Sequence, residues 1–165
     1  MQSYFTSDLH LGHKAIPKYR DCISSSAENT ELMLEKLSTL TKRDMLWILG
    51  DFLFDHPDYD SIVSKIQSMP FQLKLVMGNH DSLNLYRDFA SSIQLPLFSY
   101  KNRWVSHCPI HPQELRGRLG NIHGHLHSEH IHNDPRYFNV NIDVNDYNFV
   151  PVEHINSHFQ GIQCN

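Results

Sequence analysis

Cysteine is scarce in this chain, which holds three cysteines among 165 residues, none of them spaced as a C-x-x-C pair. This odd and unpaired set argues against a disulfide framework and against a structural zinc knuckle. Long apolar runs are missing as well, and none approaches the ~20 residues of a membrane-spanning helix. The first residues indicate a strand instead of the basic stretch and apolar core of a signal peptide, so we expect a cytoplasmic protein.

Positive charge is outnumbered as well: 14 Lys and Arg residues against 18 Asp and Glu residues give a formal net charge of −4 at pH 7. Such a chain has no general attraction for a phosphate backbone, so a long nucleic acid is a poor candidate partner. The hydrophobic content of 40% is too high for disorder, and a single domain over residues 1–165 is expected. Nothing in these numbers indicates an oligomeric state. The abundant residue is histidine, with 13 copies, and histidine is the commonest metal ligand.

Apolar periodicity divides the chain into an α/β first half and a mostly β second half. In the first half, strands are expected at 3–7, 45–49 and 71–77, and helices at 25–42, 58–69 and 82–89. In the second half, strands are expected at 94–100, 103–106, 118–123 and 136–143, before a closing helix at 151–159. The run 45–49 is apolar throughout, which is typical of a strand buried on both faces.

Polar residues that bind metals follow several of these strands. They occur in the motifs Asp8-Leu9-His10, Gly50-Asp51, Gly78-Asn79-His80-Asp81, Ser106-His107 and Gly124-His125-Leu126-His127. Each motif alone has an ordinary explanation. Gly50-Asp51 and Gly78-Asn79-His80-Asp81 fit turns, Asp8-Leu9-His10 fits a chance spacing, and Gly124-His125-Leu126-His127 fits a half-exposed strand. In this order, and each after an apolar strand, they indicate loops that converge on a site for two metal ions. The carboxylate of Asp51 is the natural bridge, because each of its oxygens can serve one ion.

This ordered set of motifs resembles the calcineurin-like metallophosphoesterase superfamily, most closely its small, uncapped branch of bacterial and phage type. The segments 6–13, 49–52, 121–127 and 139–143 match the usual sequence motifs of that branch. The resemblance implies a four-layer α/β/β/α sandwich and two divalent metal ions bridged by Asp51. The other implied ligands are Asp8, His10 and His127 for the first ion, and Asn79, His107 and His125 for the second.

Mixed carboxylate, amide and imidazole ligands suit Mn²⁺, which is our first expectation, and also Fe, Zn²⁺ or Ni²⁺. By the same resemblance, His80 is the histidine that contacts the phosphate or protonates the leaving group. Asp81 would hold the other ring nitrogen of His80, or else place a charge at the start of the following helix. His13, one turn past His10, and Arg118 are candidates for contacts with the substrate or with the ligands.

The expected enzyme is a phosphoesterase that hydrolyses small phosphodiesters such as cyclic nucleotides. The attacking group would be a hydroxide that bridges the two ions, since cations lower the pKa of bound water towards ~7. Phosphomonoesters or pyrophosphates are alternative substrates, because the same ions attack either ester. A non-catalytic scaffold for protein binding is opposed by the complete ligand set. The segments 108–118 and 128–136 directly follow ligands and are expected to wall the pocket, without any cap domain.

Overall fold

The fold, from a computed structural model, is described for residues 1–131 and 134–162. One four-stranded sheet has the order β3-β2-β1-β8. Its strands are β1 (Gln2–Thr6), β2 (Asp44–Leu49), β3 (Gln72–Val76) and β8 (Val150–Pro151). Strands β1, β2 and β3 run parallel, and β8 runs antiparallel to β1. The carboxyl ends of the three parallel strands therefore meet at one edge of this first sheet.

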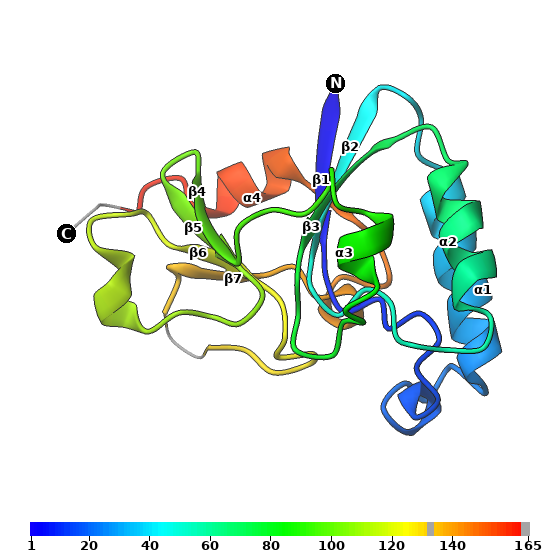
Figure 1. Ribbon diagram of the computed structural model, residues 1–165. Helices are drawn as coiled ribbons and strands as arrows, with labels where there is room; N and C mark the ends of the chain where they lie inside the picture. The colour runs from blue at the N-terminus through cyan, green and yellow to red at the C-terminus, as the bar shows by residue number, and fades with distance from the viewer. Residues whose placement is uncertain (132–133, 163–165) are drawn as a thin grey trace.

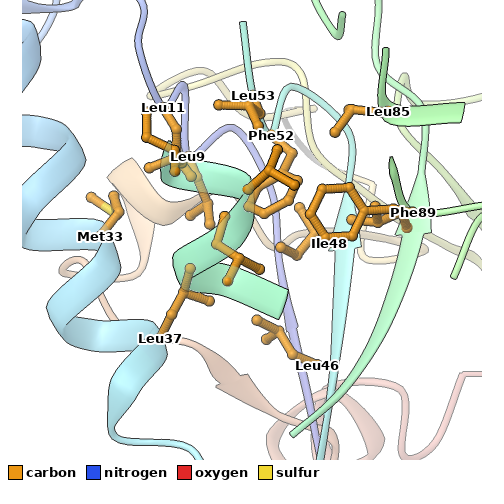
Figure 2. Packing of buried hydrophobic residues seen from close by; sticks show 14 of the residues in the cluster. Leu9, Leu11, Met33, Leu37, Leu46, Ile48, Phe52, Leu53, Leu85 and Phe89 are labelled. Carbon is orange, nitrogen blue, oxygen red and sulfur yellow. The ribbon is translucent and has the colours of Figure 1, made fainter. Parts of the chain in front are cut away.

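Helices cover one face of the first sheet (Figure 1). They are α1 (Ser26–Ser38), α2 (Tyr59–Gln67) and the short α3 (Leu85–Asp88). Met33 and Leu37 of α1 share one apolar core with Leu46 and Ile48 of β2 (Figure 2). Each of these four side chains is fully buried, which contributes about 1.5–3 kcal/mol per side chain. This core fixes the position of β2 and so of the loop that follows it.

A second four-stranded sheet has the order β4-β5-β6-β7. Its strands are β4 (Leu97–Tyr100), β5 (Arg103–Ser106), β6 (Asn121–His123) and β7 (Tyr137–Asn139). Strands β5, β6 and β7 run parallel, whereas β4 is antiparallel to β5. Val105 and Ile122 of this sheet share a second apolar core with Phe5 and Trp47 of the first. Strand β2 is therefore buried on both faces, as its continuous apolar run predicted.

The segment after β5 includes the 3₁₀ helix η2 (Pro112–Leu115). This segment is tied down because Trp104 Nε1 donates to the carbonyl of Leu115 (3.2 Å). Helix α4 (Val152–His158) follows β8 and places Val152 and Ile155 in the second core. The two packed sheets with helices outside them confirm the predicted α/β class.

Several element boundaries differ from the sequence expectation for local reasons. Ser25 caps α1 by accepting from the backbone N–H of Glu28, so this helix begins at Ser26 and not at residue 25. The strand expected over 94–100 begins only after Pro96, since proline has no N–H for a strand ladder. The run 136–143 is split, and its end forms the 3₁₀ helix η3 (Ile142–Val144). Among the described residues, no helix has the length and apolar character needed to cross a bilayer.

Candidate metal centre

All seven predicted ligands lie just after strands of the two sheets. Asp8 and His10 follow β1, Asp51 follows β2, Asn79 follows β3, His107 follows β5, and His125 and His127 follow β6. The close approach of these loops depends on glycine. A Cβ at Gly50 would overlap the ring of His107, and a Cβ at Gly124 would overlap the side chain of Ser7. The glycines in the two motifs therefore let loops from different sheets come together.

Asp8, His10 and His127, here named the first donor group, face one another in the interior. His10 Nε2 lies 3.3 Å from His127 Nε2. The Asp8 Oδ1 atom lies 3.9 Å from His10 Nε2 and 4.0 Å from His127 Nε2. Three metal-ligand atoms from two sheets thus surround one point, although the residues are up to 119 positions apart in the sequence.

Asn79, His107 and His125, here named the second donor group, converge beside the first. His107 Nδ1 lies 2.7 Å from the carbonyl of Leu49, which can only accept, so Nδ1 carries the proton and Nε2 offers a lone pair. That lone pair faces Asn79 Oδ1 at 2.9 Å and His125 Nδ1 at 3.2 Å. A nitrogen and an oxygen that both accept are held together favourably by a cation between them.

Asp51 lies between the two groups. Its Oδ2 atom is 3.8 Å from His10 Nε2, and its Oδ1 atom is 3.5 Å from His107 Nε2. Oδ1 also accepts from the backbone N–H of His80 (2.9 Å). One carboxylate oxygen therefore faces each donor group, which is the arrangement that a bridging ligand needs.

The burial of these groups also fits a bound cation. Asp8 is 0% exposed, and its Oδ1 atom is buried without a hydrogen-bond partner among the described residues. Burial raises the pKa of Asp8 and lowers the pKa of His10 to about 2, so His10 is a neutral ligand. The other oxygen of Asp8, Oδ2, accepts from the backbone N–H of His125 (3.0 Å). A buried carboxylate oxygen without a partner is costly unless it coordinates a metal. The residues present therefore fit the implied pair of metal ions.

A buried polar network behind the first donor group was not predicted from the sequence. Asp143 Oδ2 lies 2.7 Å from His127 Nδ1, and this hydrogen bond raises the pKa of His127. Arg20 Nε donates to the other oxygen of Asp143 (2.7 Å), and Arg20 Nη2 donates to the carbonyl of Asp8 (2.7 Å). Asn29 accepts from the same guanidinium (2.6 Å). The matched segment 139–143 was the one available signal for Asp143, while nothing in the sequence marked Arg20 or Asn29.

His80 and His13 lie at the rim of the first donor group, in a cluster of rings with Phe54. The rings of His13 and Phe54 stack with centroids 4.2 Å apart, and those of Phe54 and His80 lie 5.5 Å apart at 19°. His10 packs on the same cluster, 5.2 Å from His13 and 6.1 Å from His80. The His80 residue is solvent-exposed, so its ring is available to a molecule that approaches the ligands.

The structure corrects both predicted roles of Asp81. Its carboxylate accepts from the backbone N–H groups of Asp51, Phe52, Leu53 and Gly78, at 2.6–3.1 Å. It therefore holds the turns after β2 and β3 together instead of orienting the ring of His80. Helix α3 begins only at Leu85, so Asp81 is not in its first turn either.

Arg118 does not lie near the donor groups, where it was expected to contact the substrate or the ligands. Its guanidinium lies over the ring of Trp104 (5.0 Å) and donates to Asn102 Oδ1 (3.3 Å). Asn102 precedes β5 and Arg118 precedes β6, whereas the ligands follow those parallel strands at their other ends. The later part of the segment 108–118 is thus remote from the donor groups. Residues 132 and 133 of the second predicted wall lie outside the described residues.

Two packed sheets, with predicted metal ligands at the carboxyl ends of their strands and a carboxylate between two donor groups, fit a metal-dependent hydrolase. The sequence model of the calcineurin-like phosphoesterase family matches residues 1–160, and the chain belongs to this family. The family uses divalent metals, and the donor groups are candidate ligands for them.

Similar proteins cover the chain to different extents. Gene 66 proteins of the mycobacteriophages D29 and L5 are 29% and 30% identical, over 92% and 86% of this chain and of their own lengths. A symmetrical bis(5′-nucleosyl)-tetraphosphatase of Buchnera aphidicola is 33% identical over 49% of this chain, which covers 24% of that protein. A zinc-dependent endopolyphosphatase of Saccharomyces cerevisiae is 31% identical over 62% of this chain and 32% of its own length.

A solved structure supports the fold. A protein of unknown function from Aquifex aeolicus matches with a TM-score of 0.71 and 22% identity, covering 94% of this chain and 98% of its own. At this identity the likeness concerns the fold alone.

Proposed function

We propose that this protein is a cytoplasmic, dinuclear-metal phosphoesterase that hydrolyses small phosphodiesters such as cyclic nucleotides. The observation that carries the proposal is the position of Asp51. Its two oxygens face His10 at 3.8 Å and His107 at 3.5 Å, so that one carboxylate serves both donor groups. Two exposed free thiols, Cys22 and Cys108, suit a reducing compartment.

Two divalent cations, when bound, supply Lewis acidity that neutralises phosphoryl oxygens and lowers the pKa of water. We assign the remaining steps to side chains of the chain itself. His80 contacts the phosphate or gives a proton to the leaving oxygen, because its exposed ring lies beside His10. His13, whose ring lies 6.2 Å from that of His80, adds a second imidazole at the same rim. Asp143 orients His127 through the bond to Nδ1.

The openness of the rim supports a small substrate. Asn79 and His80 are both exposed, while the ligands behind them are buried or half-buried. The net charge of −4 and the absence of an inserted domain in the sequence leave little for a duplex or a folded protein to bind. Small phosphodiesters reach the donor groups without such contacts.

Hydrolysis of phosphoanhydrides is the second candidate function, and the names of two relatives favour it. The names symmetrical bis(5′-nucleosyl)-tetraphosphatase and endopolyphosphatase both refer to substrates that contain several linked phosphates. Each relative is matched over about a third of its length or less. A pyrophosphohydrolase, or a phosphomonoesterase, would use the same donor groups and the same His80.

A substrate panel tests both candidates with one Mn²⁺-loaded preparation. The panel contains bis-p-nitrophenyl phosphate, p-nitrophenyl phosphate, 2′,3′- and 3′,5′-cyclic nucleotides, a dinucleoside tetraphosphate, a phosphopeptide and a short duplex. We expect the highest kcat/KM on a small phosphodiester. A preference for the tetraphosphate would establish the second candidate, and a preference for duplex or phosphopeptide would overturn both. Hydrolysis of no substrate by protein with two bound ions would support a non-catalytic scaffold.

A further inference from the structure

Cys108 lies against the second donor group, although no role was predicted for it. Its Sγ atom and one ring nitrogen each of His107 and His125 all lie within 4.8 Å of one another. The backbone holds this geometry, because Ser106 Oγ donates to the carbonyl of Cys108 (2.6 Å). In addition, the N–H of Gly124 donates to the carbonyl of His107 (2.9 Å). A thiol thus shares the region of space that two imidazoles of the metal centre face.

The donor atoms around His107 also favour a bound cation. The hydrogen bond from His107 Nδ1 to the carbonyl of Leu49 leaves His107 Nε2 with a free lone pair. That lone pair faces Asn79 Oδ1 (2.9 Å) and Asp51 Oδ1 (3.5 Å). These three atoms all accept, and Asp51 is 1% exposed, so its carboxylate has little solvent to offset the repulsion. A positive ion among them does relieve it.

We propose that Cys108 is an additional ligand of the metal ion at the second donor group, and that it gives this position a preference for thiophilic ions over Mn²⁺. The inference rests on the proposed two-metal centre. The thiol loses its proton to solvent as the metal–sulfur bond forms, without any change of oxidation state. Thiolate is a soft ligand that selects zinc-like ions, whereas Mn²⁺ suits oxygen ligands.

The required adjustment is small. A zinc-like ion with bonds of about 2.3 Å to sulfur and 2.0–2.1 Å to nitrogen sets these atoms roughly 3.5 Å apart. The Sγ atom and the two ring nitrogens already lie within 4.8 Å of one another, so the shift needed to reach that separation is about 1 Å. The first donor group contains only carboxylate and imidazole, so the two positions differ in softness. The chain is then expected to hold a softer ion at the second position than at the first.

Cobalt substitution tests the proposal by a readout that does not depend on activity. Wild-type protein with two equivalents of Co²⁺ should show a sulfur-to-cobalt charge-transfer band in the near ultraviolet. Cys108→Ser should lose this band while it keeps the visible cobalt bands and both ions. Cys22→Ser is the matched control, because Cys22 is exposed and its Sγ bonds to Tyr147. Cys164→Ser controls for the third thiol, which lies outside the described residues.

Affinity measurements complete the test. Cys108→Ser should weaken Cd²⁺ binding by at least the roughly 10-fold that loss of even an outer partner costs, with little change for Mn²⁺. Cys108→Ala should give the same result, and circular dichroism should show both variants folded. Two bound cobalt ions without a charge-transfer band, or a band that persists in Cys108→Ser, would overturn the role of Cys108 alone. Failure of the wild type to bind two ions would instead overturn the proposed metal centre.

Discussion

Five of the seven donor residues have a backbone conformation that side chains rarely adopt. Asp8, His10, Asp51, His125 and His127 all have positive φ, between 48° and 71°. Such a conformation costs of order 1–3 kcal/mol per residue and persists only where the surrounding structure enforces it. Here the flanking strands are buried and the turns are hydrogen-bonded, so the fold supplies that enforcement. The strain is consistent with donor atoms that are positioned before any ion arrives.

Asp51→Asn is expected to abolish turnover, because it removes the carboxylate that faces both donor groups. The metal content should also fall, while the protein stays folded, since asparagine tolerates positive φ. Elemental analysis, circular dichroism and initial rates under limiting Mn²⁺ check these expectations. Near-normal rates of Asp51→Asn under limiting Mn²⁺ would contradict the assignment of Asp51 as a ligand that bridges two metal ions.

His80→Ala is expected to keep both metal ions, because the neighbouring Asn79, not His80, belongs to a donor group. Its rate should fall by roughly 10²–10⁴-fold, as is usual for the loss of a general acid. The loss should be smaller for p-nitrophenyl esters, whose leaving group needs little protonation, than for alkyl or ribose esters. Equal losses for both kinds of ester would contradict proton donation and leave contact with the phosphate as the role of His80.

The convergence of the seven donor residues could be predicted from the sequence, because each follows an expected strand. The sequence was insufficient for residues that act through contacts between distant segments. Arg20 and Asp143 are 123 positions apart and meet only in the folded chain. The role of Asp81 was also missed, because its carboxylate turns towards the backbone after β2, a contact between segments about 30 positions apart.

At the scale of elements, Asp81 joins the turns after β2 and β3, which carry Asp51, Asn79 and His80. Asp81→Ala would leave buried backbone N–H groups without an acceptor. We expect the metal-free variant to lose more unfolding free energy than the ~1–3 kcal/mol that one unsatisfied buried donor costs. Denaturant titration measures this loss.

Asp60→Ala is the matched control for Asp81→Ala. The side chain of Asp60 is 94% exposed on α2 and lies 3.6 Å from Arg87, so its loss should change the unfolding free energy by ~0.5 kcal/mol or less. Similar losses for the two variants would show that the Asp81 bonds add nothing specific to the stability of the turns.

The accuracy of the predicted elements follows the strength of the apolar signal. Strand β2, with a continuous apolar run, lies within one residue of its expected position. Strand β8 has only two residues and was missed, because its pairing with Phe5 and Tyr4 depends on the tertiary fold. Pro151, expected inside the closing helix, instead ends β8 and precedes α4. That residues 1–165 form a single domain stays a prediction.

At the scale of the whole molecule, the metal centre lies where the two sheets meet. The first sheet supplies Asp8, His10, Asp51 and Asn79, and the second supplies His107, His125 and His127. Both donor groups contain residues from each sheet. Bound ions would therefore link the sheets directly, in addition to the apolar core formed around Phe5, Trp47, Val105 and Ile122.

Removal of the metal ions is expected to lower the thermal stability of the whole fold. Each ion that binds only the folded chain adds ~2.7 kcal/mol when its free concentration is about 100 times its Kd. For a protein of this size, each such ion corresponds to a rise in Tm of roughly 5–10 °C. Calorimetry of EDTA-treated and Mn²⁺-reloaded protein measures the shift. Asp51→Asn should lose most of it, whereas Asp60→Ala, far from the donor groups, should retain it. An unchanged Tm, in protein shown by elemental analysis to gain two ions on reloading, would mean that the ions do not hold the sheets together.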